Sequence, residues 1–253
     1  GGVMSITGHP GGPPTRPGLS LGDIAAGLFT AIGILAALRE RDQSGEGQLV
    51  DVSMLDCQVA ILENAFMRYF ATGELPGPIG TRHPLATPFQ AFPTKDGYLV
   101  LALWGGAENQ WEMLCALLGQ QDLIYDERFA TNDARTENHA QLEPVLNDAM
   151  RQRTTAEWLR EFDAIGIPCG PLNNIAQAAE HPQVRARDML VEVEHPVMGK
   201  LPLSNTPVKL SRTPGGIKGP SPLLGQHTDE VLRALLGASD EEIASLRESE
   251  VVR

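Results

Sequence analysis

Apolar residues recur at helical spacing directly after Asp23. The series advances in steps of four, four and three and consists of Ile24, Leu28, Ile32 and Leu35. This spacing predicts a helix from Asp23 to about Arg41. Because the helix is apolar on nearly every side, we expect it to be buried in a protein interior. Gly27 and Gly33 weaken a helix, so they are either places where another element or a ligand approaches closely, or tolerated defects.

A short apolar run follows the glycine-rich turn at 44–47. It contains Leu49, Val50 and Val52 and predicts a buried strand over 48–54, followed by a helix to Tyr69. A strand between two helices indicates a large α/β domain of the doubly wound, Rossmann-like kind.

Glycine and proline dominate residues 71–93, which we therefore expect to be a linker at a domain boundary. A strand is predicted over 98–104 and helices over about 107–118, 132–153 and 154–165, with Thr154 or Thr155 as cap of the last. These elements predict a smaller α+β domain. Residues 211–224 are again rich in glycine and proline, which interrupt helices and strands. Two helices are predicted after them, the second with a capping box of Ser239 and Glu242.

This pattern divides the chain into four parts. Residues 1–75 belong to the large α/β domain, 76–95 form a linker and loop, 96–205 form the small domain, and 206–253 return to the large domain.

The composition of the chain argues against several classes of function. The 253 residues carry a formal net charge of -12, which argues against a nucleic-acid-binding protein. No apolar run approaches the roughly 20 residues of a membrane span. The three cysteines are far apart and odd in number, which favours a reduced, cytoplasmic protein without a metal site.

Asp23 allows two interpretations. As the N-cap of its helix, its carboxylate would accept hydrogen bonds from free backbone amides and stay ionised near the positive end of the helix dipole. A desolvated, ionised carboxylate at a helix start is also a plausible nucleophile toward an activated acyl group. The helical spacing alone favours the interpretation that Asp23 only caps its helix.

Several segments together resemble one enzyme family. They are LGDIAAG, GILAALRER and SGEGQLVDVSMLD within 20–56, IGIPCGPL at 165–172, HPQVRARDM at 181–189, and PLLGQHTDEVL at 222–232. In this order they resemble the family III CoA-transferases, which include the formyl-CoA:oxalate and L-carnitine CoA-transferases. The first residues match a segment well inside family members, so the chain lacks roughly the family's N-terminal third.

The resemblance implies transfer of coenzyme A from an acyl-CoA to a small carboxylic acid. It makes Asp23 the nucleophile that forms a covalent aspartyl intermediate, and it makes Met54 a CoA contact, although core packing is an equal alternative for Met54 on chemistry alone. It also implies an interlocked homodimer and coenzyme A as substrate, with no permanently bound cofactor.

Family members carry a mobile loop over the catalytic Asp, and the matching residues here are Gly80, Thr81, Arg82 and His83, followed by Pro84. The formyl-CoA transferases have glycines and Gln at this place. Arg82 and His83 could instead hold an acceptor carboxylate, or they could be ordinary loop residues.

Two alternatives to CoA transfer remain. One is proton transfer of the 2-methylacyl-CoA racemase type, and the other is a noncatalytic fragment or assembly subunit. We expect Cys169 to be structural, because no base is near it in the sequence, and His227 to be a helix-start or docking residue.

Overall fold

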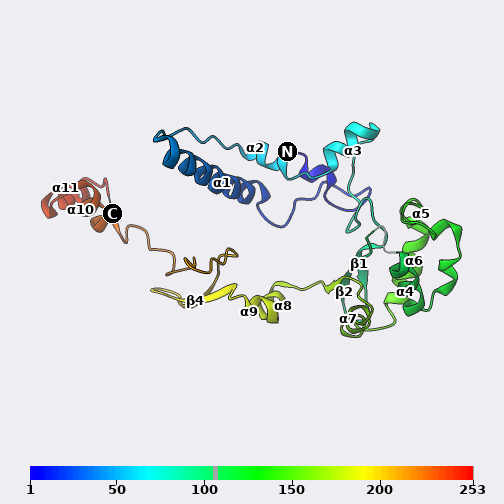
Figure 1. Ribbon diagram of the computed structural model, residues 1–253. Helices are drawn as coiled ribbons and strands as arrows, with labels where there is room; N and C mark the ends of the chain where they lie inside the picture. The colour runs from blue at the N-terminus through cyan, green and yellow to red at the C-terminus, as the bar shows by residue number, and fades with distance from the viewer. Residues whose placement is uncertain (105–107, 253) are drawn as a thin grey trace. The chain divides into compact units, whose positions relative to one another are not determined.

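The computed structural model describes residues 1–104 and 108–252 (Figure 1). The chain divides into two compact units, Gly1–Leu172 and Asn173–Arg253. The first unit begins with a short 3-10 helix, η1 (Val3–Ile6), and the helices α1 (Leu21–Ser44), α2 (Met54–Ala60) and α3 (Ala65–Thr72). The described fold is mixed α/β, with helices and two small antiparallel sheets.

Helix α1 confirms the helix predicted from the apolar spacing. It starts two residues before Asp23, with Ser20 as its N-cap, so the prediction that Asp23 is the N-cap is wrong. Gly45 ends the helix in a left-handed conformation, with φ of 79°, which a residue without a side chain adopts readily. Of the two glycines inside the helix, Gly33 meets a close neighbour: a Cβ there would lie 2.9 Å from Cγ1 of Val50, whereas one at Gly27 would meet nothing within 4 Å.

The prediction that this helix is buried is wrong for the described residues. Ala25 is its one buried residue, and its main neighbour is α2, which at seven residues is too short to cover a helix of 24. By length and composition α1 could cross a membrane, and the core helix of a large domain has the same properties.

No strand forms at 48–54, contrary to the prediction. The segment is extended, Leu49 is 90% exposed, and no neighbouring strand among the described residues supplies the hydrogen bonds that a strand needs. The helix predicted to reach Tyr69 is interrupted between α2 and α3, where Glu63 has a φ of 55°. A parallel, doubly wound sheet is not seen in the described part of the chain.

The rest of the first unit is built on a three-stranded antiparallel sheet in the order β1 (Phe89–Pro93), β2 (Tyr98–Ala102), β3 (Cys169–Pro171). Strand β1 lies within the segment predicted to be a linker. The strand was not predicted because prolines flank it: Pro88 precedes the strand and Pro93 is its last residue. Pro93 is tolerated because β1 is an edge strand, where a missing amide breaks no hydrogen bond of the sheet.

Helices cover this sheet and complete a hydrophobic core (Figure 1). They are α4 (Glu108–Leu118), η2 (Gln121–Ile124), η3 (Glu127–Phe129), α5 (Asn132–Glu137), α6 (His139–Met150) and α7 (Thr155–Ala164). The helix predicted over 132–153 is thus two helices, and Ala107 lies outside the described residues. Thr154 caps α7 and forms a capping box with Glu157. The largest fully buried side chains include Trp158, Phe92 and Phe162.

The second unit contains a β-hairpin and four helices. The elements are α8 (Ile175–Glu180), α9 (Pro182–Ala186), β4 (Leu190–His195), β5 (Gly199–Ser204), α10 (Thr228–Leu236) and α11 (Asp240–Glu248). The predicted capping box of Ser239 and Glu242 is confirmed at the start of α11. Arg247 of α11 pairs with Asp229 of α10 at 2.6 Å, which joins the two last helices.

Candidate functional site

Asp23 is the third residue of α1 and its side chain is exposed. The first helical bond beside it runs from the Ile24 amide to the Ser20 carbonyl at 3.0 Å. No hydrogen bond or ion pair joins the Asp23 carboxylate to another residue in the described ranges. The expected desolvation of this carboxylate is therefore wrong within these residues, because the side chain is exposed in the first turn of a long helix, at its positive end.

The turn that carries Asp23 lies against α2. A Cβ on Gly22 would come within 2.9 Å of the Gln58 side-chain nitrogen, so the absence of a side chain lets α2 approach directly beside Asp23. Met54 is the first residue of this helix, and its N-cap Ser53 accepts hydrogen bonds from the Leu55 and Asp56 amides. Met54 is 55% exposed, so it does not serve as core packing among the described residues.

The loop residues Gly80 to His83 are held by hydrogen bonds on both sides. The Gly80 amide donates to the Gly8 carbonyl at 2.8 Å, which ties the loop to the segment that leads to α1. Thr81 accepts from the Ala91 amide at 3.1 Å, and the Arg82 Nε donates to the Ile79 carbonyl at 3.4 Å. Gly80 has a φ of 73°, a conformation that favours glycine.

The His83 side chain contacts two aromatic rings. Its imidazole stacks on Phe89 and meets the edge of Trp104, with centroid distances of 5.0 and 5.2 Å. The Leu85 amide donates to His83 Nδ1 at 3.2 Å, so a neutral imidazole here carries its proton on Nε2. His83 therefore offers one oriented donor.

Helix α5 anchors the residues that follow this loop. Asn132 donates to the Leu85 carbonyl at 2.8 Å and accepts from the Thr87 amide at 3.0 Å. The buried Arg135 donates to the Thr87 carbonyl at 2.8 Å. These bonds hold the residues directly after the loop, Leu85 and Thr87, against α5.

A buried polar cluster behind Arg82 was not anticipated from the sequence. The Gln90 side chain bonds to His139 Nε2 and donates to Glu143 at 3.0 Å. Burial lowers the pKa of His139 below its usual range, the charge of Arg82 lowers it further, and Glu143 opposes both. No local pattern could predict this cluster, because Gln90 and His139 lie 49 positions apart in the chain.

The remaining candidates have structural roles. Burial raises the pKa of the Cys169 thiol, as does the nearby charge of Asp163, which opposes a nucleophilic role. His227 is the N-cap residue of α10, which confirms the helix-start interpretation, and its Nδ1 lies 3.1 Å from Glu230. The described residues contain no cluster of three or more metal-ligating side chains.

The structure thus places Gly22, the neighbour of Asp23, against Gln58 of α2, and it brings the loop together with β1 and α5. No hydrogen bond or ion pair between the loop and Asp23 is present in the part of the chain described.

The sequence of residues 1–228 matches CoA-transferase family III. The chain belongs to this family. It is 35% identical over 251 residues to human succinyl-CoA:glutarate CoA-transferase, covering 99% of this chain and 57% of the relative. It is 37% identical over 234 residues to succinate–glutarate CoA-transferase of Agrobacterium fabrum, covering 92% of this chain and 58% of the relative.

The chain is also 39% identical over 211 residues to acetyl-CoA:oxalate CoA-transferase of Acetobacter aceti, covering 83% of this chain and 52% of the relative. Among solved structures, a CAIB/BAIF family protein from Brucella suis superimposes with a TM-score of 0.78 at 35% identity, over 91% of this chain and 59% of that one. The family III chain described here therefore spans a little over half the length of these relatives.

Proposed function

We propose that this family III chain belongs to an enzyme that transfers coenzyme A from an acyl-CoA to a carboxylic acid through a covalent intermediate on Asp23. The observation that carries the proposal is the position of Asp23: an exposed carboxylate in the first turn of α1, without a hydrogen bond or ion pair among the described residues and next to Gly22, which lies against Gln58 of α2. Relatives named as transferases support it over a racemase.

The proposed reaction proceeds by two exchanges on the Asp23 carboxyl. One Asp23 oxygen attacks the donor thioester carbonyl, and the carbon–sulfur bond breaks. CoA departs as the thiolate, and a mixed anhydride of Asp23 and the donor acyl group is formed. The thiolate then attacks the Asp23 carbonyl carbon, which releases the donor acid and forms an aspartyl-CoA thioester. The acceptor carboxylate attacks this thioester, and the same two steps in reverse deliver acyl-CoA and restore Asp23. No water is consumed, so the thioester free energy is conserved.

Backbone amides of the first turn of α1 are proposed to stabilise the oxyanions, because the first amides of a helix lack partners within the helix and point at its start. The exposed Met54 at the start of α2 is proposed to contact CoA. Residues Gly80 to His83 are proposed to close over Asp23 and exclude water. The hydrogen bond from Gly80 to Gly8 supports this role, since it links the loop to the segment that precedes α1.

Arg82 and His83 are proposed to hold the acceptor acid. A guanidinium and an oriented imidazole N–H both suit a carboxylate, and two relatives are named for glutarate, which carries a second carboxylate after one is activated. The exposed apolar surface of α1 supports an interlocked homodimer, since a surface of this kind needs a partner in a folded protein.

The test measures exchange between succinyl-CoA and glutarate and traps the intermediate with hydroxylamine. We expect Asp23→Ala and Asp23→Asn to abolish both exchange and hydroxamate formation. Asp56→Ala is the matched control, because Asp56 is exposed in the first turn of α2 and is given no role. Undiminished exchange by Asp23→Ala contradicts the mechanism. A wild-type chain that is neither active nor stabilised by millimolar CoA is a noncatalytic fragment.

A further inference from the structure

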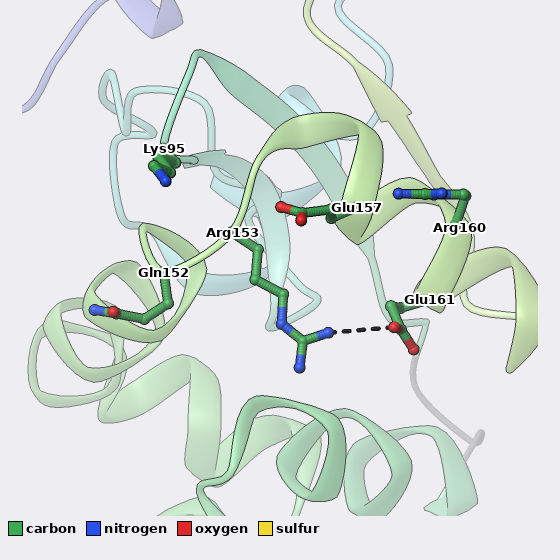
Figure 2. Close-up of a pocket in the computed structure, with 6 residues that line it drawn as sticks. All are labelled: Lys95, Gln152, Arg153, Glu157, Arg160 and Glu161. Carbon is green, nitrogen blue, oxygen red and sulfur yellow. Dashed lines mark hydrogen bonds and ion pairs between the residues drawn. The ribbon is translucent and has the colours of Figure 1, made fainter.

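A polar depression opens on the first unit beside the start of α7 (Figure 2). Its volume is about 600 Å³, and it is lined by Lys95, Gln152, Arg153, Glu157, Arg160 and Glu161. These side chains come from the turn between β1 and β2, the connection between α6 and α7, and α7 itself. None of them belongs to the candidate active site.

The two carboxylates of the depression are already engaged. One oxygen of Glu157 accepts from the Thr154 amide at 2.8 Å and from the Thr154 hydroxyl at 2.7 Å. These bonds, first the amide and then the hydroxyl, lower the pKa of Glu157, and the charges of Arg160 and Lys95 add to the effect. Glu161 forms an ion pair with Arg153 at 3.3 Å. Both carboxylates remain charged, so the lining carries three positive and two negative charges, an excess of one positive charge.

Contacts of the side chain hold Arg153 and Arg160, whereas among the described residues Lys95 is held only through its backbone. Arg153 lies over the Trp158 ring at 4.8 Å and between Gln152 and Glu161 in the view of Figure 2. The backbone of Lys95 is fixed to that of Arg153 by a bond of 2.9 Å, and Arg160 donates from Nε to the Ala156 carbonyl at 3.3 Å. Within the described residues, neither Lys95 nor Arg160 forms an ion pair.

The Thr155 and Glu157 backbone amides at the start of α7 are not available to bind an anion in this depression. Asp96 accepts from the Thr155 amide at 2.7 Å and the Glu157 amide donates to the Thr154 hydroxyl oxygen, so these amides are taken. Any anion in the depression must therefore be held by side chains. On a chain with a net charge of -12, a depression with three cations and two engaged carboxylates is a local exception.

We propose that this depression binds a compact phosphate-bearing polyanion through Lys95, Arg153 and Arg160. Guanidinium groups contact phosphate oxygens at two points, and the lysine adds a third positive charge. A diphosphate suits the site better than a single phosphate, because the cations line a wide opening and only a ligand with several charges reaches more than one of them. The proposal is independent of CoA transfer.

The test is calorimetric titration of the full chain at low salt with inorganic pyrophosphate and, separately, with ADP. We expect saturable binding of one pyrophosphate and a weakening of at least about 10-fold in the Lys95→Gln/Arg160→Gln double variant, since two charge-assisted contacts are lost. Binding of ADP as tight as that of pyrophosphate assigns recognition to the phosphates, and tighter binding adds a contact to the nucleoside; both support the site.

The matched control is the Arg39→Gln/Arg41→Gln double variant, which also removes two positive charges but alters exposed side chains of α1 that do not line the depression. We expect its affinity to change by less than about 2-fold, because surface charges outside the depression act weakly through solvent. Circular dichroism checks that both variants fold. Equal weakening in the two double variants, or no saturable binding of pyrophosphate by the wild type, overturns the proposal.

Discussion

The His83 ring lies nearly parallel to that of Phe89, with an interplanar angle of 9° and a centroid distance of 5.0 Å. The same two residues are joined along the backbone, since the His83 amide donates to the Phe89 carbonyl at 2.8 Å. The first residue of β1 therefore sets both the position and the orientation of the imidazole. A histidine held in this way is suited to selecting a ligand by one hydrogen bond.

His83→Ala is expected to lower kcat/KM for glutarate by about 10-fold, the effect of one lost hydrogen bond to a charged group. Pentanoate has the same chain length and lacks the second carboxylate, so its much lower rate should change little. The comparison of the two acids in wild type and variant is the measurement. Equal loss for both acids would assign His83 to the shape of the loop rather than to acceptor recognition.

The two glycines inside α1 should respond differently to alanine. Gly27→Ala is expected to stabilise the helix by about 0.5–1 kcal/mol, because alanine loses less backbone freedom and meets no neighbour within 4 Å. Gly33→Ala should lose that gain, since its Cβ would press against Val50. Thermal unfolding followed by circular dichroism compares them. If Gly33→Ala is the more stable variant, the close approach of Val50 is wrong.

Asp96 links the turn after β1 to the start of α7. Hydrogen bonds from the Thr155 amide, and then from the Thr155 hydroxyl, lower its pKa below the ordinary value of 3.8. A carboxyl with a lowered pKa in the folded state stabilises the fold above its unfolded pKa and loses this contribution as pH falls through the folded pKa. Asp96→Ala should therefore be less stable than wild type at pH 7, and the difference should shrink below pH 3.8.

The control for this prediction is Asp163→Ala, near the end of α7, whose side chain forms no hydrogen bond among the described residues. Urea unfolding across the pH range is the measurement. A difference between wild type and Asp96→Ala that stays constant down to the lowest pH would show that the carboxylate charge is not involved.

His139 makes a second pH dependence testable. Burial, and then the charge of Arg82, lower its pKa below the ordinary value of 6.5. The folded state thus favours the neutral ring, so its contribution to stability is present above pH 6.5 and is lost as pH falls through the folded pKa. His139→Gln should show a shallower loss of stability between about pH 7 and 5 than wild type. His9→Gln, at an exposed position, should keep the wild-type slope.

Phe162 tests the core of the first unit. Its ring is fully buried and stacks on Trp158 at a centroid distance of 5.4 Å. Phe162→Ala is expected to cost about 3–5 kcal/mol through lost burial and the cavity left behind. Tyr125→Ala, at a residue that is 84% exposed, should stay within about 0.5 kcal/mol of wild type. Tryptophan fluorescence during urea unfolding reports on this unit, because all three tryptophans lie in it.

Local features of the fold were predictable. The apolar spacing predicted α1, the choice of Thr154 or Thr155 as cap predicted the start of α7, and the pairing of Ser239 with Glu242 predicted the start of α11. Each depends on residues at most four positions apart. The same reasoning failed at Asp23, because the helix begins at Leu21 and spacing alone does not fix the first helical residue.

The sequence predicted which residues belong to the candidate site but not how they are arranged in space. Motifs along the sequence pointed to the family, to Asp23 and to the loop at 80–83, and the family is confirmed. The chemical roles of Asp23, Met54, Arg82 and His83 stay predictions, as does the four-part division of the chain. The close approach of Gln58 to Gly22 could not be foreseen, since it depends on how α1 and α2 pack.

The amino-acid sequence by itself determined that α1 is helical, where α7 and α11 start, and which family the chain resembles, because these depend on neighbouring residues and on ordered motifs. Only the tertiary structure decided that β1 forms between two prolines, that His83 is oriented by Phe89, and that Gln90 meets His139. It also decided that α1 is exposed. Burial and long-range hydrogen bonds depend on what the rest of the fold places beside a residue, and no local pattern contains that information.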